Sequence, residues 1–336
     1  MNLNKKAIFI FILLNTKINL LKSDIDNFDK LWEQTRNIYQ ELVAEINKDI
    51  PFYVSRKYTT SYWFSMCQEL KNLLSEPKPI KEFLKFPPIA CNMIRGINGE
   101  FGLPQKFEES YLLNCVSETN KKRFKDFANK NEEPLAKCSK EFNCSSTTLG
   151  HLFYLAKVLE NSVNEPNKIV QLGGQYGNFA KITKQILPKC TFIIFDLPEL
   201  LAIQNLFLSC NAPDIKLKIH KNDSTLNNLE SEYVHLIPIY LMEKFNSENI
   251  DVFVSTFALS ETPEFVQKLV IKKNFLNSKL VYLTGQLNGW SENDYYWIPD
   301  HKNLLSSVRN QYKFVNCVPF HINSELQNSF ELIAHN

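Results

Sequence analysis

The stretch KIVQLGGQYGNFAKI, residues 168–182, decides the fold of this 336-residue chain. Its residues 169–172 form a short apolar run, which is typical of a buried strand. Three glycines follow this run: Gly173, Gly174 and Gly177. A helical pattern then begins at Asn178 and ends at Pro188. A strand, a glycine turn and a helix in this order let the backbone approach a ligand and aim helix N–H groups at it.

After this unit, short apolar runs alternate with helical patterns, which predicts a doubly wound parallel sheet. The expected strands span residues 169–172, 191–195, 235–240, 251–255, 280–284, 312–318 and 329–334. Helices are expected to begin at Asn178, Pro198 and Thr262, and residues 211–233 to form a variable stretch. We therefore predict an α/β, Rossmann-like domain of seven strands over residues 147–336. Its closing pair of strands is more typical of methyltransferases than of dehydrogenases.

The preceding residues 23–146 are predicted to be mostly helical. Apolar residues recur at helical spacing over 24–47 and 62–74, and a helix from Thr147 to about Leu159 leads into the sheet domain. The N-terminal helices would form a cap beside the ligand site or the interface of a homo-oligomer, and the sequence leaves both roles open.

The first 22 residues contain a short hydrophobic segment. Lys5 and Lys6 precede the apolar run 7–14, as in a short signal peptide. The run is too short to cross a membrane, and no small-x-small cleavage site follows it. We therefore expect a cytoplasmic protein without a transmembrane span, with export as the alternative.

Composition excludes some classes of partner. Hydrophobic residues make up 44% of the chain and charged residues 22%, as in an ordinary globular protein. The net charge of +2 comes from 38 basic and 36 acidic residues spread along the chain, so no nucleic-acid partner is expected. The eight cysteines form no C-x-x-C pair and have no histidine at ligand spacing, so we expect no metal site.

Two features within 168–196 indicate the kind of ligand. Gly173 and Gly177 fit the first and last positions of the G-x-G-x-G turn of methyltransferases, whose middle position is Gln175 here. A dinucleotide fingerprint would also need glycines at 175 and 178, which makes an NAD-linked oxidoreductase the weaker alternative. Asp196 ends the second strand about 20 residues beyond the turn, where a carboxylate can accept both ribose hydroxyls of an adenosyl group. Taken alone, each feature also has a purely structural explanation: the glycines could form an ordinary strand-to-helix turn, and Asp196 could cap the helix that begins at Pro198.

Four segments together resemble a known family. They are IVQLGGQYGNFAKI at 169–182, FDLPELLAIQNLFLS at 195–209, HLIPIYLMEKF at 235–245 and DVFVSTFALSETP at 251–263. The chain from Thr147 onward is similar to sugar O-methyltransferases of the nanchangmycin sugar O-methyltransferase type. The resemblance implies transfer of the methyl group of S-adenosylmethionine (SAM) to a hydroxyl of a sugar or glycosylated small molecule. The cofactor-binding residues that it implies are Gly173, Gly174, Gly177, Asp196, Leu197, Ile239 and Ser255.

Gln171 and Gln175 depart from the family pattern. Gln171 replaces an acidic residue expected to bind the methionine amino group, although its amide oxygen can still accept a hydrogen bond from an ammonium. Gln175 adds a side chain where the backbone usually passes close to the ligand. These departures leave open the alternative of a non-catalytic binding protein with a methyltransferase fold.

Methyl transfer to an alcohol needs a base for the hydroxyl proton. The candidates are Glu261 and His301, which follow the carboxyl ends of the fourth and fifth expected strands, with Asp294 as a weaker choice. Glu261 would otherwise complement the dipole of the helix expected at Thr262, and His301 would otherwise lie in a surface loop. Aromatic residues in the same loop could stack on a sugar or simply pack together. They are Trp290, Tyr295, Tyr296 and Trp297.

Overall fold

The computed structural model describes most of the chain outside its N-terminal segment. The described residues are 25–49, 58–76, 84, 86, 89–90, 93–94, 103–131, 135–226, 229–246, 248–286, 301–320 and 329–336. The predictions for residues 1–22, for Asp294 and for the aromatic residues 290–297 lie outside these ranges. Within them, no helix has the length and apolar character needed to cross a membrane.

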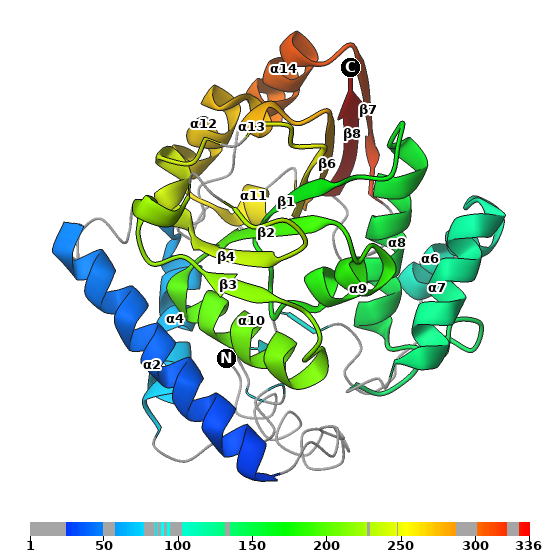
Figure 1. Ribbon diagram of the computed structural model, residues 1–336. Helices are drawn as coiled ribbons and strands as arrows, with labels where there is room; N and C mark the ends of the chain where they lie inside the picture. The colour runs from blue at the N-terminus through cyan, green and yellow to red at the C-terminus, as the bar shows by residue number, and fades with distance from the viewer. Residues whose placement is uncertain are drawn as a thin grey trace, which may run out of the picture.

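An eight-stranded sheet lies at the centre of the molecule, in the order β3-β4-β2-β1-β5-β6-β8-β7 (Figure 1). Its strands are β1 (Lys168–Leu172), β2 (Thr191–Asp196), β3 (Leu217–Ile219), β4 (Val234–Pro238), β5 (Val252–Thr256), β6 (Leu280–Gln286), β7 (Phe314–Pro319) and β8 (Ser329–His335). All pairs are parallel except those of β8, which runs antiparallel to both β6 and β7. The chain proceeds from β1 to one side and returns to the other side at β5, so the sheet is doubly wound.

The seven predicted strands are confirmed, and the expectation for 211–233 was incomplete. The additional strand β3 lies in this stretch and pairs with β4 at the edge of the sheet. Its three residues are all half-buried, and a segment this short gives no periodic signal in the sequence.

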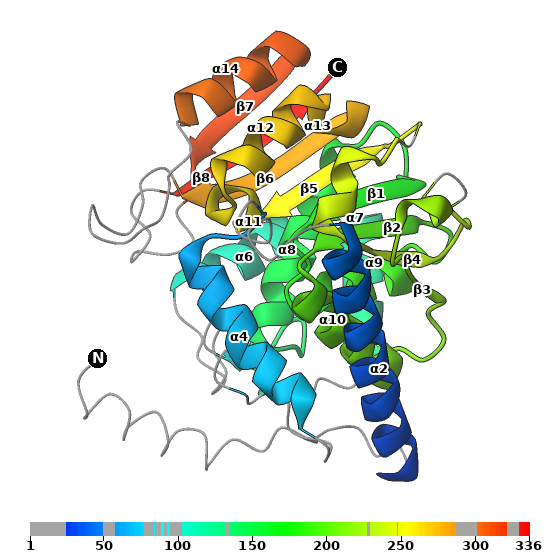
Figure 2. The same cartoon turned by 90° about the vertical axis from the view of Figure 1, so that its left-hand side faces the viewer.

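Helices cover both faces of the sheet (Figure 2). On one face lie α8 (Ser146–Asn161), α9 (Asn178–Ile186) and α10 (Pro198–Asn211), and on the other α12 (Glu264–Lys272), α13 (Asn274–Asn277) and α14 (His301–Gln311). Alternate strand residues serve the two faces: Val252 and Val254 belong to the first core, and Phe253 to the second. The central strands β1, β2, β4, β5 and β6 are therefore mainly apolar and buried, as a sheet covered on both faces requires, whereas the edge strand β7 is partly exposed.

The N-terminal helices pack on the first face. They are α2 (Ile25–Asp49), α4 (Ser61–Ser75), α6 (Leu103–Asn114) and α7 (Glu118–Lys130). Helix α2 runs along α10 and α4, while α6 packs on α8 and α7 on α9 (Figures 1 and 2). Their buried side chains, such as Trp32 and Leu70, belong to the same core cluster as the strands.

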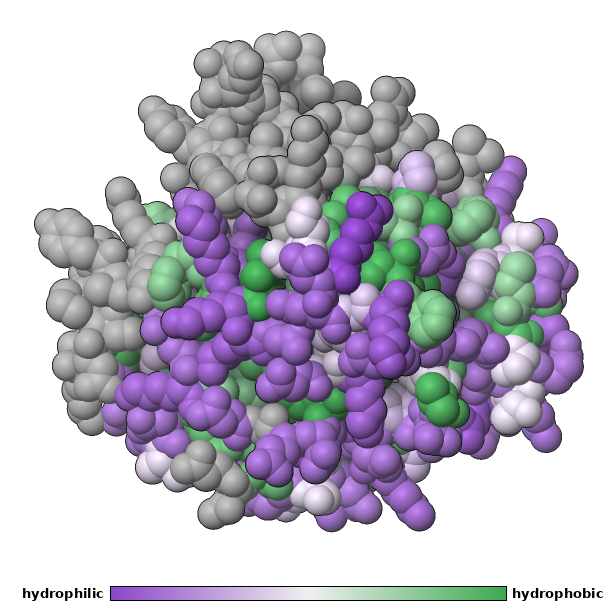
Figure 3. Space-filling view, turned by 90° about the horizontal axis from the view of Figure 1, so that it is seen from above, coloured by the Kyte–Doolittle hydropathy of each residue, from purple (hydrophilic) through white to green (hydrophobic). Residues whose placement is uncertain are grey.

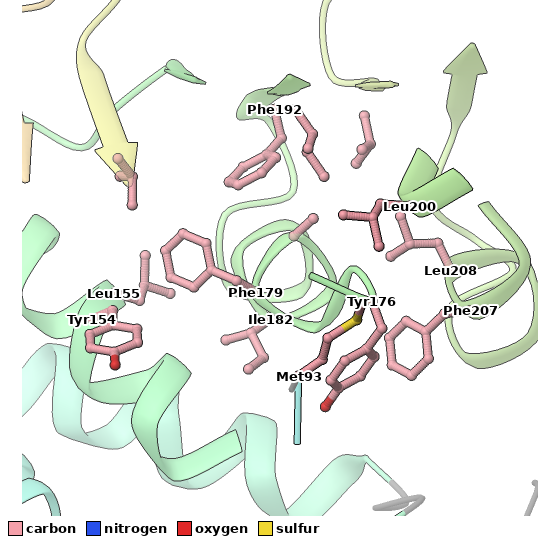
Figure 4. Close-up of a cluster of buried hydrophobic side chains, with 14 of the residues drawn as sticks. Met93, Tyr154, Leu155, Tyr176, Phe179, Ile182, Phe192, Leu200, Phe207 and Leu208 are labelled. Carbon is pink, nitrogen blue, oxygen red and sulfur yellow. The ribbon is translucent and has the colours of Figure 1, made fainter. Parts of the chain in front are cut away.

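A cluster of aromatic side chains holds the turn after β1 in place. Tyr176 is only 1% exposed, and its ring meets that of Phe207 on α10 edge to face, with 4.8 Å between centroids. Met93 lies beside the two rings, and Phe179 packs on Phe192 of β2 (Figure 4). The turn is thus anchored between α9 and α10 by a large buried side chain.

Seen from above, the described surface is mainly hydrophilic, with scattered apolar side chains (Figure 3). This matches the ordinary charged content of the sequence. The homo-oligomer through the N-terminal helices stays a prediction.

Candidate functional site

The turn after β1 and the carboxylate at the end of β2 are in direct contact. The Gly174 N–H donates a hydrogen bond of 2.7 Å to Asp196 Oδ2, and the Leu197 N–H donates one of 2.8 Å to Oδ1. The parallel pairing of β1 with β2 brings these strand ends together. Asp196 is 5% exposed, and burial raises its pKa to about 6, although the hydrogen bonds that it accepts lower the pKa. The juxtaposition expected from the sequence is therefore present.

A buried glutamine of α10 joins this contact. Gln204 Nε2 donates to Asp196 Oδ2 at 2.7 Å and to the Gln175 carbonyl at 3.0 Å. Gln204 was not predicted from the sequence, where its only signal is a polar residue within the apolar run LLAIQNLFL.

The side chain of Gln175 is directed toward α8. Gln175 has a positive φ of 51°, a conformation that glycine adopts more easily. Its Oε1 lies 3.2 Å from His151 Nε2, and His151 Nδ1 lies 3.1 Å from Asn178 Nδ2. His151 could not be predicted from the sequence either, because its partner is fixed only by the packing of α8 against the turn. The amide is thus bound to α8 and has no hydrogen bond to Asp196.

Glycine is required at the three positions of the turn for different structural reasons. A Cβ at Gly173, whose φ is +78°, would lie 2.1 Å from the Cβ of Ala258, and one at Gly174 would lie 2.7 Å from Gln204 Nε2. Gly177 has a φ of 101° and caps α9. The first two glycines are thus needed for close approach of neighbouring elements, and their role in ligand binding stays a prediction.

A buried acceptor without a partner lies two residues before the turn. Gln171 is 2% exposed, and its Oε1 accepts no hydrogen bond from any described residue. Leaving a buried acceptor unpaired costs about 1–3 kcal/mol. An ammonium group of a ligand could supply the missing donor, and the contact of Gln171 with the amino end of SAM stays a prediction.

The ends of β4 and β5 place two more predicted residues. Ile239 is buried and begins the 3-10 helix η4 (Ile239–Glu243), directly after Pro238, which pairs with Asp196. Ser255 Oγ donates to the Leu172 carbonyl at 3.2 Å and accepts from the Leu259 N–H at 2.9 Å. Ser255 therefore ties the end of β1 to the following helix, and its contact with a ligand stays a prediction.

Glu261 lies in α11 (Ala258–Glu261), which follows β5 directly. The helix expected from Thr262 is thus wrong in its start: Thr262 ends α11, and Pro263 caps α12. Phe257, before α11, has a φ of +68°, a strained conformation for a bulky residue.

The Glu261 carboxylate has a partner on α4, because Trp63 Nε1 donates a hydrogen bond of 3.0 Å to its Oε2. Burial raises the pKa of Glu261 to about 7, although the Trp63 hydrogen bond lowers it. Such a pKa suits a group that takes up a proton near neutrality.

His301 begins α14, so the loop expected at this position is wrong. The side chain of His301 lies outside the described part of the structure, and its role stays a prediction. Among the described residues, no group of three or more His, Cys, Asp or Glu side chains could hold a metal ion.

No protein-family model and no curated protein matches the sequence. Similar solved structures include the plantazolicin methyltransferase BpumL in complex with SAH (12% identity, TM-score 0.37, covering 70% of this chain and 100% of that one). A second is the methyltransferase domain of bacterial CtHen1 (10% identity, TM-score 0.36, covering 56% of this chain and 96% of that one). A third is the pyocyanin biosynthetic protein PhzM (13% identity, TM-score 0.36, covering 57% of this chain and 59% of that one). The strand order, with β8 antiparallel between β6 and β7, defines the fold of this chain. It is a doubly wound, Rossmann-like α/β fold.

Proposed function

We propose that this chain binds SAM at the carboxyl ends of β1 and β2 and transfers its methyl group to a hydroxyl of a sugar or glycosylated small molecule. The observation that carries the proposal is the 2.7 Å contact between the Gly174 N–H and Asp196 Oδ2. It joins the glycine turn to a carboxylate in the arrangement that suits an adenosyl group. A cytoplasmic location belongs to the proposal, because SAM is a cytosolic cosubstrate.

Each end of SAM has a chemically matching group in this site. Asp196 Oδ1 accepts one hydrogen bond, from Leu197, and its second lone pair can accept a ribose hydroxyl. Gln171 Oε1 would accept from the ammonium, and the apolar side chains of Leu197 and Ile239 would flank the adenine ring. Ser255 would lie near the methionine part.

When bound, SAM supplies an electrophilic methyl group on a sulfonium. As the acceptor oxygen takes this methyl group, its proton must pass to a base, and the Glu261 carboxylate is the group that we assign to it. A pKa of about 7 leaves a large fraction of Glu261 ionised at neutral pH, while its conjugate acid is still formed readily. His301 is the second candidate for this role.

Thermal unfolding in the presence of SAM, S-adenosylhomocysteine or NADH tests the binding step. SAM and S-adenosylhomocysteine should raise the melting temperature, because a ligand that binds only the folded state stabilises it. The Asp196→Ala variant should lose this response. Asp223→Ala is the matched control, because Asp223 pairs with Lys244 on the surface of the same domain. A response to NADH alone would support the oxidoreductase, and a response to none of the three ligands would refute the proposal.

Turnover is tested by following formation of S-adenosylhomocysteine with a panel of glycosylated acceptors.

A second candidate function is favoured by one observation: Asp196 Oδ2 is already bound by both Gly174 and Gln204. This carboxylate oxygen could serve only internal packing. Binding of SAM without methylation of any sugar acceptor would favour a non-catalytic binding protein.

A further inference from the structure

The first turn of α4 holds Trp63 in a defined position. Thr60 caps this helix, because its Oγ1 accepts from the Trp63 N–H at 3.5 Å and its carbonyl accepts from the Phe64 N–H at 2.8 Å. The Trp63 ring also meets that of Tyr62 edge to face, with 5.7 Å between centroids. From this turn the indole N–H reaches Glu261, which lies 198 positions later in the sequence.

Other contacts keep α4 in place without help from Glu261. Leu70, Leu73 and Leu74 are at most 2% exposed in the shared core. Trp32 Nε1 and Arg36 Nε of α2 donate to the carbonyls of Glu76 and Leu74 at the end of the helix, both at 3.2 Å. Ahead of α4, the Tyr58 hydroxyl donates to Glu243. The Trp63–Glu261 bond is therefore not required to dock the helix.

The hydrogen bond from Trp63 affects the pKa of Glu261. Glu264 and Lys268, the nearest charged residues along the following helix, pair with each other. Among the described residues, the Trp63 N–H is the one group that lowers the pKa of Glu261 against burial. An indole N–H donates but cannot ionise, so it stabilises the carboxylate without adding a competing cation or proton.

We infer that Trp63 is a positioning residue for the proposed methyl transfer: it holds Glu261 by Oε2 and leaves Oε1 to receive the acceptor proton. This inference rests on the proposed function. Helix α4 of the N-terminal region then does more than cover the sheet, because it supplies a side chain that holds the candidate base.

The Trp63→Phe variant tests the inference, because it keeps a ring and removes the N–H. Trp32→Phe is the matched control, since it removes an indole N–H that donates to a backbone carbonyl at the other end of α4. The protein is labelled with ¹³C at glutamate Cδ and measured without ligand, and the Glu261 resonance is assigned by its loss in Glu261→Gln. The pKa read from this resonance should be about one unit higher in Trp63→Phe than in the wild-type protein. It should not shift in Trp32→Phe. An unchanged titration in Trp63→Phe would overturn the inference.

A wild-type measurement covers the case in which Trp63→Phe does not fold. One ¹⁵N-indole resonance should shift with pH at the same midpoint as Glu261 and stop shifting in Glu261→Gln. If no indole resonance titrates with Glu261, the inference is wrong.

Kinetics supply a separate readout. The kcat of Trp63→Phe should fall about tenfold at pH 6 with the KM for SAM unchanged, and recover toward the wild-type value at pH 9, where Glu261 is ionised in both proteins. A loss of kcat that is equal at every pH would refute the positioning role. If the wild-type protein methylates no acceptor, the proposed function fails, while the two resonance experiments still decide whether Trp63 controls Glu261.

Discussion

Replacing Gln204 by leucine should weaken the contact between the glycine turn and Asp196 in a pH-dependent manner. The substitution nearly preserves side-chain volume and removes the hydrogen bonds to Asp196 Oδ2 and to the Gln175 carbonyl. The bond to the carboxylate contributes about 2 kcal/mol and the bond to the carbonyl about 1 kcal/mol. Removing Gln204 Oε1, a buried acceptor without a partner, returns about 1 kcal/mol. The free energy of unfolding should therefore fall by about 2 kcal/mol at pH 8.

The pH dependence follows from Asp196. Its pKa in the folded protein is about 6, above its ordinary value of 3.8, so the folded state favours the protonated form. The stability that this group contributes is present at low pH and is lost as the pH rises through 6. Without Gln204, the pKa of Asp196 should rise by about one further unit, which corresponds to about 1.4 kcal/mol. Because Asp196 is largely protonated at pH 5 in both proteins, the difference in stability should shrink to about 1 kcal/mol or less there.

Urea unfolding followed by circular dichroism at pH 5 and pH 8 measures both values. Gln267→Leu is the matched control, because Gln267 is also buried and donates one hydrogen bond of 2.8 Å to the Thr262 carbonyl. This control should lose about 1 kcal/mol at both pH values. If the cost of Gln204→Leu is as independent of pH as that of the control, then Gln204 does not stabilise the ionised carboxylate and the reasoning fails.

Three further predictions concern stability elsewhere. Asn277 has a φ of 56° in the left-handed turn α13, which asparagine tolerates and a β-branched residue does not, so Asn277→Val should lower the free energy of unfolding by about 1–2 kcal/mol in urea titrations. Asn277→Gly should change it much less, because the relief of the left-handed conformation is offset by loss of the hydrogen bond from Asn274 and by the greater freedom of the unfolded chain. Burial lowers the pKa of His220 to about 4, so the stability that its neutral form contributes should be complete above pH 6.5 and lost as the pH falls toward 4. In His220→Leu, the free energy of unfolding should decrease less steeply between pH 6.5 and pH 4. An unchanged dependence on pH would contradict the assignment. Lys157 pairs with Glu331 Oε2 at 2.9 Å, with side chains 13% and 7% exposed, while Glu331 Oε1 accepts a hydrogen bond of 2.9 Å from the Tyr282 hydroxyl. Lys157→Met should cost about 3 kcal/mol, because it removes the only cation paired with a buried carboxylate among the described residues. The double variant Lys157→Met/Glu331→Leu should recover part of this loss in chemical denaturation, since it removes the buried charge but leaves the Tyr282 hydroxyl without its acceptor.

The unit from β1 to β2 could be predicted from the sequence because its signals are local. An apolar run, a glycine turn and a helix stopped by Pro188 follow one another, and Asp196 closes the next apolar run. Asp196 and the turn could be brought together in advance because neighbouring parallel strands end at the same edge of a sheet. The short β3 and the start of α11 gave no comparable signal.

The contacts from the N-terminal helices could not be predicted. Trp63 reaches Glu261 across 198 positions, and Tyr39 reaches Glu199 across 160 positions with a hydrogen bond of 3.2 Å. Helical spacing identifies the buried side of α4, but it does not indicate which carboxylate the indole will meet. Such pairs are set by the packing of whole helices, which a single sequence does not encode in any short pattern.

The close approach of Gly173 to Ala258 links two parts of the site mechanically. Ala258 is the first residue of α11 and Glu261 the last, so the glycine turn bears on the same helical turn that carries the candidate base. Any displacement of the turn on ligand entry would be passed to that carboxylate within one turn of helix. A bulkier residue at position 258 would then press on the Gly173 turn and shift Glu261, the candidate base, from a distance.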